Sequence, residues 1–275
     1  MTFRIKVAIT CLSLSAICTF AQEQKRAITV EELVSWQRIT KSDLSDDGNY
    51  IAVKHEPWKG DATVLLYNKT GKEIARFSPA GSFAFAPSSQ FLVVEEKPAV
   101  AEVEKLKLQK AKRDRMPMDK LILFAPTGQR ETLDSVRTQK LAKATDWMAY
   151  QRGDKKDSTL YVRSLDGKFV DSIPAVSDFG FAEKGELLYY VSAGDSIDKK
   201  AGIYVYQTTS RKQSLIKEGK GNFRKVQFNK VGDKLAFLYA DKVDKAEKDS
   251  TDEKSKYALH LSVVPEQAKL LAGQG

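Results

Sequence analysis

The chain has 275 residues, of which 42% are hydrophobic and 29% are charged, and its formal net charge is +9. This apolar content excludes a disordered chain and predicts a folded core, with room for one large β domain or two average domains. A basic excess also occurs in proteins that bind nucleic acids or anionic surfaces, but acidic residues are interspersed here and no nucleic-acid module is recognisable. We therefore expect a solvated charged surface and no nucleic-acid partner.

Residues 1–21 have the pattern of a signal peptide. Arg4 and Lys6 give a positive start, an apolar stretch follows, and the small residues Thr19 and Ala21 occupy the two positions that a signal peptidase requires. Removal of this leader leaves a charge of +7 and predicts an exported protein, periplasmic or extracellular, that does not remain in the membrane.

Both cysteines of the chain lie in this leader. Cys18 raises the alternative of a lipoprotein anchor, which Ile17 disfavours because a small residue is needed just before a lipidated cysteine. With Cys11 and Cys18 removed, the mature chain has no cysteine. Disulfides, thiol catalysis and cysteine-ligated metals are therefore excluded.

A short helix is predicted at the start of the mature chain. Thr29 can accept a hydrogen bond from the backbone N–H of Glu32, and the Glu32 side chain can reach back to the N–H of Thr29. This is a capping box, and Ile28 can pack on Leu33 as a hydrophobic staple. We expect the helix to end near Trp36.

One pattern then recurs along the chain: an apolar residue, a polar turn of four or five residues that usually contains a glycine, and a hydrophobic strand. The copies begin at Leu44, Phe85, Phe181 and Phe228, and a shortened copy without the glycine covers residues 146–150. Successive copies are mostly about forty residues apart, which is typical of β-propeller blades.

Within each repeat, alternating apolar and polar runs joined by Asp-Gly or Thr-Gly turns predict hairpins. The sequence therefore predicts an all-β fold, a partial β-propeller of about five four-stranded blades, with a short N-terminal helix and one helical insertion. The expected divisions are the tail and helix at 22–40 and blades at 41–80, 81–135, 136–175, 176–218 and 219–275, the last strand being Ala268 to Leu271.

Two insertions interrupt the blades. Residues 99–119 are rich in Glu, Lys, Arg, Leu and Ala and are expected to contain a helix that Met116-Pro117 ends. This insertion is either a lid or basic arm above the propeller or a solvated excursion between two strands. Residues 241–256 are almost wholly charged and small, and are expected to form a loop.

No catalytic nucleophile is recognisable. The Gly-x-Ser-x-Gly elbow of an α/β-hydrolase is absent, and the nearest string, Gly194 to Asp198 around Ser196, lacks the second glycine and reads as a turn. The two histidines, His55 and His260, have no serine or cysteine context and are expected to be strand residues.

Two adjacent carboxylate pairs occur, and neither is expected to work as a general acid and base. The helix start explains Glu31 and Glu32, and a strand end beside a basic insertion explains Glu95 and Glu96. No His and carboxylate spacing suits a metal, and there is no phosphate-binding loop. We therefore assign no catalytic, cofactor-binding or metal-binding residue.

Aromatic side chains offer a further binding possibility, because they can stack on sugars or peptides. Most lie at strand positions where packing between blades requires large side chains, so core positions are favoured. The residues concerned are Trp36, Trp58, Tyr67, Trp147, Tyr161 and Tyr204.

Several of these features together resemble one protein family. They are the segment Ile28 to Leu33 with Trp36, the turn Leu44 to Tyr50, the Phe85 to Ser88 variant of a Ser-Pro-Asp-Gly repeat, and the basic insertion closing with Met116-Pro117. This combination resembles the N-terminal portion of exported serine peptidases of the prolyl oligopeptidase family, including relatives of dipeptidyl peptidase IV and acylaminoacyl peptidase. The individual repeats also occur in TolB-like propellers.

The resemblance implies a propeller of seven or eight blades that filters peptide substrates ahead of an α/β-hydrolase domain. This chain has about five blade units and offers no residue that matches the family's catalytic serine, aspartate or histidine. Neither glutamate pair has the surroundings of the glutamates that hold a substrate's amine in dipeptidyl peptidases. The chain is therefore expected to be a fragment of a longer peptidase, a free-standing five-bladed binding module, or a relic without activity.

Overall fold

The computed structural model describes residues 27–112, 115–153, 158–194, 200–241 and 257–265. Three of the sequence-based expectations fall outside them: the signal peptide 1–21, the string around Ser196 and the last expected strand, Ala268 to Leu271. The charged loop 241–256 is described only at Asp241.

The structure is mostly β, with 53% of the described residues in strands and 8% in helices. Within the described ranges, four antiparallel sheets have four strands and a fifth has three, and in each sheet the strands follow one another in chain order. Sheet 1 contains β1 (Gln37–Leu44), β2 (Tyr50–Pro57), β3 (Thr63–Asn68) and β4 (Glu73–Phe77); sheet 2 contains β5 (Ala80–Phe85), β6 (Leu92–Glu96), β7 (Lys120–Phe124) and β8 (Arg130–Leu133); sheet 3 contains β9 (Val136–Leu141), β10 (Trp147–Arg152), β11 (Leu160–Ser164) and β12 (Val170–Ile173); sheet 4 contains β13 (Val176–Phe181), β14 (Leu187–Ser192), β15 (Gly202–Gln207) and β16 (Lys212–Glu218); and sheet 5 contains β17 (Asn222–Phe228), β18 (Lys234–Ala240) and β19 (Ala258–Val263). Repeated antiparallel sheets of this kind agree with the predicted partial propeller.

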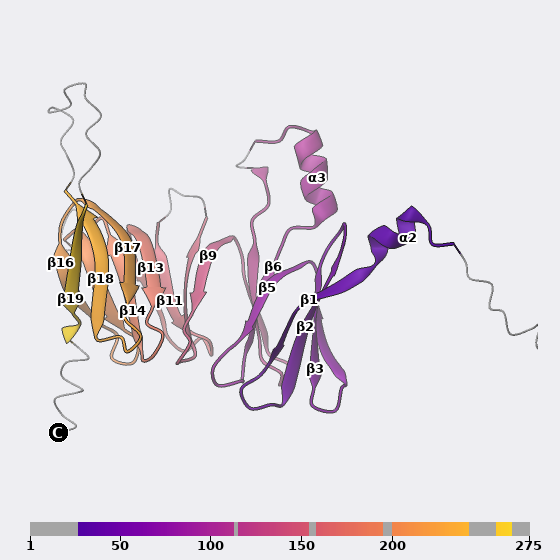
Figure 1. Ribbon diagram of the computed structural model, residues 1–275, viewed down its shortest axis with the longest axis horizontal. Coiled ribbons are helices and arrows are strands. Elements are labelled where there is room, and N and C mark those ends of the chain that lie inside the picture. Colours follow the sequence, from indigo (N-terminus) through magenta and orange to yellow (C-terminus); the bar gives the residue numbers. More distant parts are fainter. Residues whose placement is uncertain (1–26, 113–114, 154–157, 195–199, 242–256, 266–275) are drawn as a thin grey trace, which may run out of the picture.

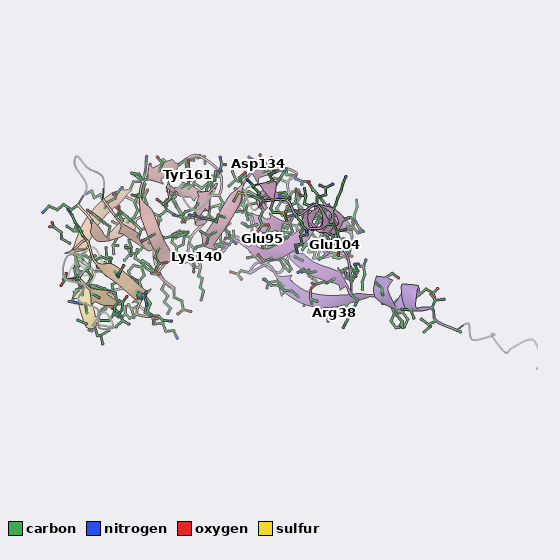
Figure 2. The ribbon with its side chains drawn as sticks, turned by 90° about the horizontal axis from the view of Figure 1, so that it is seen from above. Arg38, Glu95, Glu104, Asp134, Lys140 and Tyr161 are labelled. Carbon is green, nitrogen blue, oxygen red and sulfur yellow. The ribbon has the colours of Figure 1, made fainter. Side chains whose placement is uncertain are left out.

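The sheets stack side by side along an arc, from sheet 1 at one end to sheet 5 at the other (Figures 1 and 2). Seen from above, Lys140 of β9 lies toward the concave side of the arc, whereas Tyr161 of β11 lies toward the convex side (Figure 2). The strand order therefore places the first strand of sheet 3 at the concave edge and its last strand at the convex edge.

The core lies between the sheets. Side chains of a strand point alternately to its two faces, so the central strands of an inner sheet are apolar on both faces. In β10, Met148 and Tyr150 pack toward sheet 2, while Ala149 packs toward sheet 4. One apolar cluster of this kind fills each of the four spaces between neighbouring sheets.

Acidic residues on the outermost strands link neighbouring sheets. Glu131 of β8 accepts two hydrogen bonds from Arg163 of β11, at 2.6 and 2.8 Å. At the equivalent position of β12, Asp171 accepts from Arg211 of the β15–β16 turn and from the hydroxyl of Tyr206 in sheet 4. The pKa of Glu131 is lowered chiefly by its hydrogen bonds from Arg163.

The recurring turn is closed by its own polar side chains. Asp47 accepts hydrogen bonds from the Ser45 hydroxyl at 2.6 Å and from the Asn49 backbone N–H at 3.0 Å, and Gly48 has a φ of +70°, which favours glycine. These bonds, that from Ser45 first, lower the pKa of Asp47. The turn thus fixes the register of the hairpin that follows.

The N-terminal helix confirms the predicted capping box, and it ends beside Trp36 as expected. Helix α2 (Val30–Ser35) has Thr29 as N-cap, with both bonds between Thr29 and Glu32 present. Strand β1 begins at Gln37, four residues before the approximate start expected for the first blade. The sequence does not mark this start, because β1 has no buried residue and pairs with β2 without an apolar alternation.

The insertion contains the expected helix, α3 (Val100–Leu108), in which no residue is buried. Asp61 of sheet 1 accepts a hydrogen bond of 2.8 Å from the Val100 N–H, and Lys59 lies 3.6 Å from Glu104. The helix ends at Leu108, well before Met116-Pro117. These contacts favour the solvated excursion anchored to sheet 1 over a lid (Figure 1).

Candidate functional site

The first strand of every sheet carries a β-bulge in its pairing with the second. The register shifts lie between Ile39 and Lys41, between Ala80 and Phe83, between Val136 and Thr138, between Val176 and Asp178, and between Arg224 and Gln227. Bulges bend a strand and redirect its side chains, and they are common beside functional sites. The bulged first strands therefore make the concave edge the candidate binding surface.

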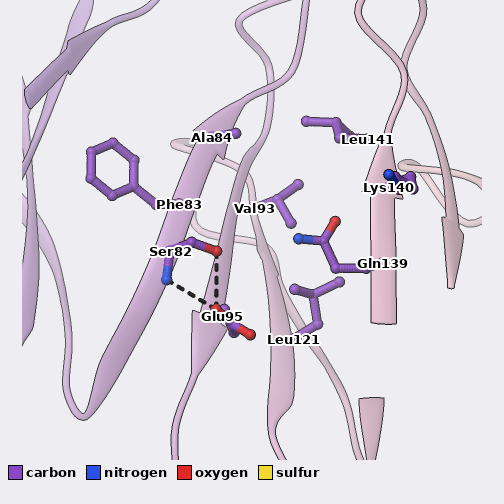
Figure 3. Close-up of a pocket in the computed structure, with 9 residues that line it drawn as sticks. All are labelled: Ser82, Phe83, Ala84, Val93, Glu95, Leu121, Gln139, Lys140 and Leu141. Atoms are coloured by element: carbon purple, nitrogen blue, oxygen red, sulfur yellow. Dashed lines mark hydrogen bonds between the residues drawn. The ribbon is translucent and has the colours of Figure 1, made fainter. Parts of the chain in front are cut away.

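A cavity of about 220 Å³ lies between sheets 2 and 3 (Figure 3). A second cavity of about 220 Å³ shares Glu95, Leu121 and Gln139 with it and continues along the same boundary. We call the two together the inter-sheet groove. Its first part is lined by Ser82, Phe83, Ala84, Val93, Glu95, Leu121, Gln139, Lys140 and Leu141, and its second part also by Asp119, Lys120, Val136, Arg137 and Thr138.

Glu95 is the central charged group of the groove. Its carboxylate accepts hydrogen bonds from the N–H and the hydroxyl of Ser82, at 3.1 and 3.0 Å, and from Lys97 at 2.7 Å. Lys97 also donates to Asp119 at 2.6 Å. Partial burial raises the pKa of Glu95, but the bonds from Lys97 and Ser82 outweigh it, so the pKa lies below its usual value. Glu95 is thus an ionised and already neutralised group.

Gly81 makes this arrangement possible. A Cβ at residue 81 would lie 2.6 Å from a carboxylate oxygen of Glu95 and 2.9 Å from the Lys97 side chain. Residue 81 sits in the bulge of β5, whose shifted register leaves the Ser82 N–H to bond the carboxylate instead of the neighbouring strand. A side chain at position 81 would therefore displace Glu95.

Gln139 is the polar group on the opposite wall. Its side chain points between the sheets (Figure 3), and within the described residues its amide has no hydrogen-bond partner. Gln139 pairs with Tyr150, whose ring packs toward sheet 2, so Gln139 faces the same way. An amide that lacks partners in a partly enclosed groove is free to bind a ligand.

The residues singled out from the sequence are not brought together. His55 lies on β2 of sheet 1, whereas His260 lies on β19 of sheet 5 and stacks on Phe237 at 5.3 Å between ring centroids. Glu95 and Glu96 point to different partners, since Glu96 lies 3.7 Å from Arg130. Of the other pair, Glu32 caps its helix.

Two of the six aromatic residues contradict the expectation of core positions. Trp36 is 56% exposed and Trp58 is 78% exposed, because they lie outside the strands, at the end of α2 and in the β2–β3 turn. Tyr204 is buried, while Trp147 and Tyr161 stack on neighbouring rings and Tyr67 is half-buried.

No group of three or more His, Cys, Asp or Glu side chains in the described ranges is placed to hold a metal ion. Helices α2 and α3 are both too short to cross a membrane, as is any other helix in the described ranges.

The class that the fold defines is the β-propeller, and comparisons with known proteins add no family. No family model and no curated protein matches the chain. Among solved structures, a prolyl endopeptidase is 12% identical with a TM-score of 0.47 over 74% of this chain, an oligogalacturonate lyase in complex with manganese is 12% identical with a TM-score of 0.43 over 85%, and a putative TolB from Agrobacterium tumefaciens is 10% identical with a TM-score of 0.38 over 82%. The matches cover 32%, 66% and 76% of those chains, so this chain spans about a third of the prolyl endopeptidase. Similarities of this size carry no functional argument.

Proposed function

We propose that this chain is the substrate-admitting propeller portion of an exported serine peptidase of the prolyl oligopeptidase family. The propeller restricts access to short peptides, and a Ser-His-Asp triad outside these 275 residues performs hydrolysis. The family assignment rests on the sequence resemblance described above. By itself the chain is expected to hydrolyse nothing.

The observation that carries the proposal is an exposed apolar face at each end of the arc. On sheet 5, Leu259, Leu261 and Val263 are 75%, 68% and 61% exposed, and on sheet 1 Ile51 and Leu44 are 41% and 55% exposed. Between neighbouring sheets of the arc, faces of the same composition pack against the next sheet. Contiguous apolar surface of this kind is the signature of a covered interface.

We infer that further propeller structure covers these faces in the complete protein. A sheet of the same kind is the partner that sheets 2 to 4 already use, and it buries apolar surface that costs about 25 cal/mol per Å² when left in water. The chain alone is therefore expected to associate through these faces.

The test is labelling by an active-site serine phosphonate probe. It is applied in parallel to the purified 275-residue chain and to the native gene product from its source cells. Labelling of a larger native species that contains this sequence supports the proposal. If neither sample is labelled and the purified chain is folded and monodisperse, the peptidase assignment is wrong and the chain is a free-standing binding propeller.

A further inference from the structure

We propose that the inter-sheet groove between sheets 2 and 3 binds an extended peptide, with a backbone amide of the peptide paired to Gln139 and one apolar side chain in the cavity. The inference deepens the proposed function and rests on it only for the meaning of the binding, since binding itself is measured separately. It names the site and the part of the peptide that is recognised.

Sheets 2 to 5 each have a preceding sheet and can be compared with one another. Two residues before the end of its first strand, each of these sheets has a side chain that faces the preceding sheet. Phe83, Phe179 and Val226 stand at this position in sheets 2, 4 and 5, and each is at most 6% exposed within an apolar cluster. In sheet 3 the residue is Gln139. The groove lies at the one such position whose side chain is polar.

The glutamine also costs the fold packing energy. Gln139 is half-buried, and beside a cavity its side chain packs less well than a residue that fills the space. Phenylalanine or valine at residue 139, as in the other sheets, would fill more of that space. A polar residue that weakens the packing of a regular repeat points to a binding role.

The chemistry of the groove suits a peptide as its occupant. A side-chain amide donates and accepts at once, so it matches the N–H and C=O of a peptide bond. Val93, Leu121 and Leu141 provide an apolar lining beside it. Each of the two cavities, at about 220 Å³, is below the roughly 300 to 1,000 Å³ of pockets that enclose whole small ligands, so each suits one side chain of a longer molecule that runs along the groove.

The charges of the groove point the same way. Glu95 is neutralised by Lys97 and held by Ser82, so it offers no uncompensated charge to a free cation. Glu95 therefore does not by itself draw a cation into the groove, and the Gln139 amide is the neutral polar group that faces the occupant. In addition, β5 and β9 each pair on one side only within the described sheets, and such strand edges accept extended chains.

The experiment measures peptide binding to the full chain by fluorescence anisotropy. The probe is fluorescein-labelled Ala-Ala-Leu-Ala-Ala, blocked at the carboxyl end. Two matched peptides carry glycine in place of leucine, or an N-methyl group on the leucine nitrogen. Both are expected to bind at least tenfold more weakly, because one lacks the apolar side chain and the other lacks the N–H donor.

Protein variants locate the site. Gln139→Leu fills the cavity in the manner of the other sheets and is expected to weaken binding at least tenfold. Gln139→Glu keeps the size but removes the donor, and is expected to weaken binding at least threefold. Gln227→Leu makes the same substitution on the first strand of sheet 5, outside the groove, and is expected to change affinity less than twofold. Circular dichroism verifies that all three remain folded.

Equal binding by Gln139→Leu and the unmodified chain overturns the proposal, as does equal binding of the leucine and glycine peptides. Binding of maltotetraose that depends on Gln139, without peptide binding, overturns it in favour of a saccharide site. The phosphonate result does not enter these outcomes. A peptide-binding groove in a chain whose native form is never labelled would refute the peptidase assignment alone.

Discussion

Replacing Glu131 by alanine tests how the sheets are held together at the convex edge. Glu131 and Arg163 form a bidentate ion pair, with two hydrogen bonds, between sheets 2 and 3. The side chain of Arg163 is 5% exposed, whereas that of Glu131 is 42% exposed. Glu131→Ala therefore leaves a buried guanidinium without its carboxylate, while Arg163 Nε still donates to the Ser164 carbonyl at 3.1 Å and Tyr150 remains beside the guanidinium.

The expected cost lies between two limits. Exposed ion pairs contribute about 0.2 to 1 kcal/mol, and breaking a fully buried pair by removing one partner costs about 3 to 5 kcal/mol. Since one partner here is buried and the other is partly in water, we expect a loss of about 2 kcal/mol. For a domain of this size each kcal/mol lowers the Tm by about 2 to 4 °C, which gives a decrease of about 4 to 8 °C.

The matched control is Glu73→Ala. Glu73 and Arg76 also form a bidentate ion pair, with both hydrogen bonds at 3.0 Å. Both residues belong to β4, however, and their side chains are 36% and 59% exposed. Here the expected change in Tm is at most about 2 °C, measured by calorimetry at neutral pH. Equal changes for the two variants would refute the argument that burial of Arg163 makes the inter-sheet pair important.

Three further outcomes are expected. The stability difference between the unmodified chain and Glu131→Ala is present above pH 5 and disappears as the pH falls through the lowered pKa of Glu131. The reason is that the carboxylate is then protonated in the folded and in the unfolded state. Urea titrations at a series of pH values measure this difference. Asp61→Ala removes the acceptor at the start of α3, costs about 1 kcal/mol locally and speeds hydrogen exchange of the α3 amides by about fivefold, with unchanged exchange in sheet 4 as the control. Gly81→Ala pushes the Glu95 carboxylate from Ser82, so its pKa rises toward the usual value in a ¹³C NMR titration; an unchanged pKa would contradict the close approach at residue 81.

The hairpins are the part of the fold that the sequence predicts well, because their causes are local. A turn such as Ser45 to Asn49 contains both the side chains that bond its backbone and the glycine that adopts a positive φ. The capping box of Thr29 and Glu32 is local in the same way. Features whose hydrogen-bond partners lie within about five residues can therefore be predicted from the sequence.

Features that depend on residues far away in the sequence cannot be predicted in this way. Strand β1 owes its conformation to pairing with β2, and its own residues carry no apolar alternation. The end of α3 at Leu108 follows from the left-handed Lys110, with no glycine or proline to mark it. Similarly, Glu95 reads as half of a carboxylate pair in the sequence, while its bonds to Ser82 and Lys97 require the bulge of β5.

Gln139 shows how a repeat makes a binding site detectable in principle. Its own neighbourhood, Thr138-Gln139-Lys140, reads as an ordinary polar strand edge. Only alignment of the first strands of sheets 2 to 5, counted back from their last residues, shows that the other three sheets bury Phe83, Phe179 or Val226 where sheet 3 has an amide. In a repeat protein each copy is a control for the others, because all copies solve the same packing problem. A copy that departs from the common solution at a position that the other copies bury, and has a cavity there, loses stability that the fold itself does not require it to lose. The departure is therefore informative about function even where no catalytic motif is present.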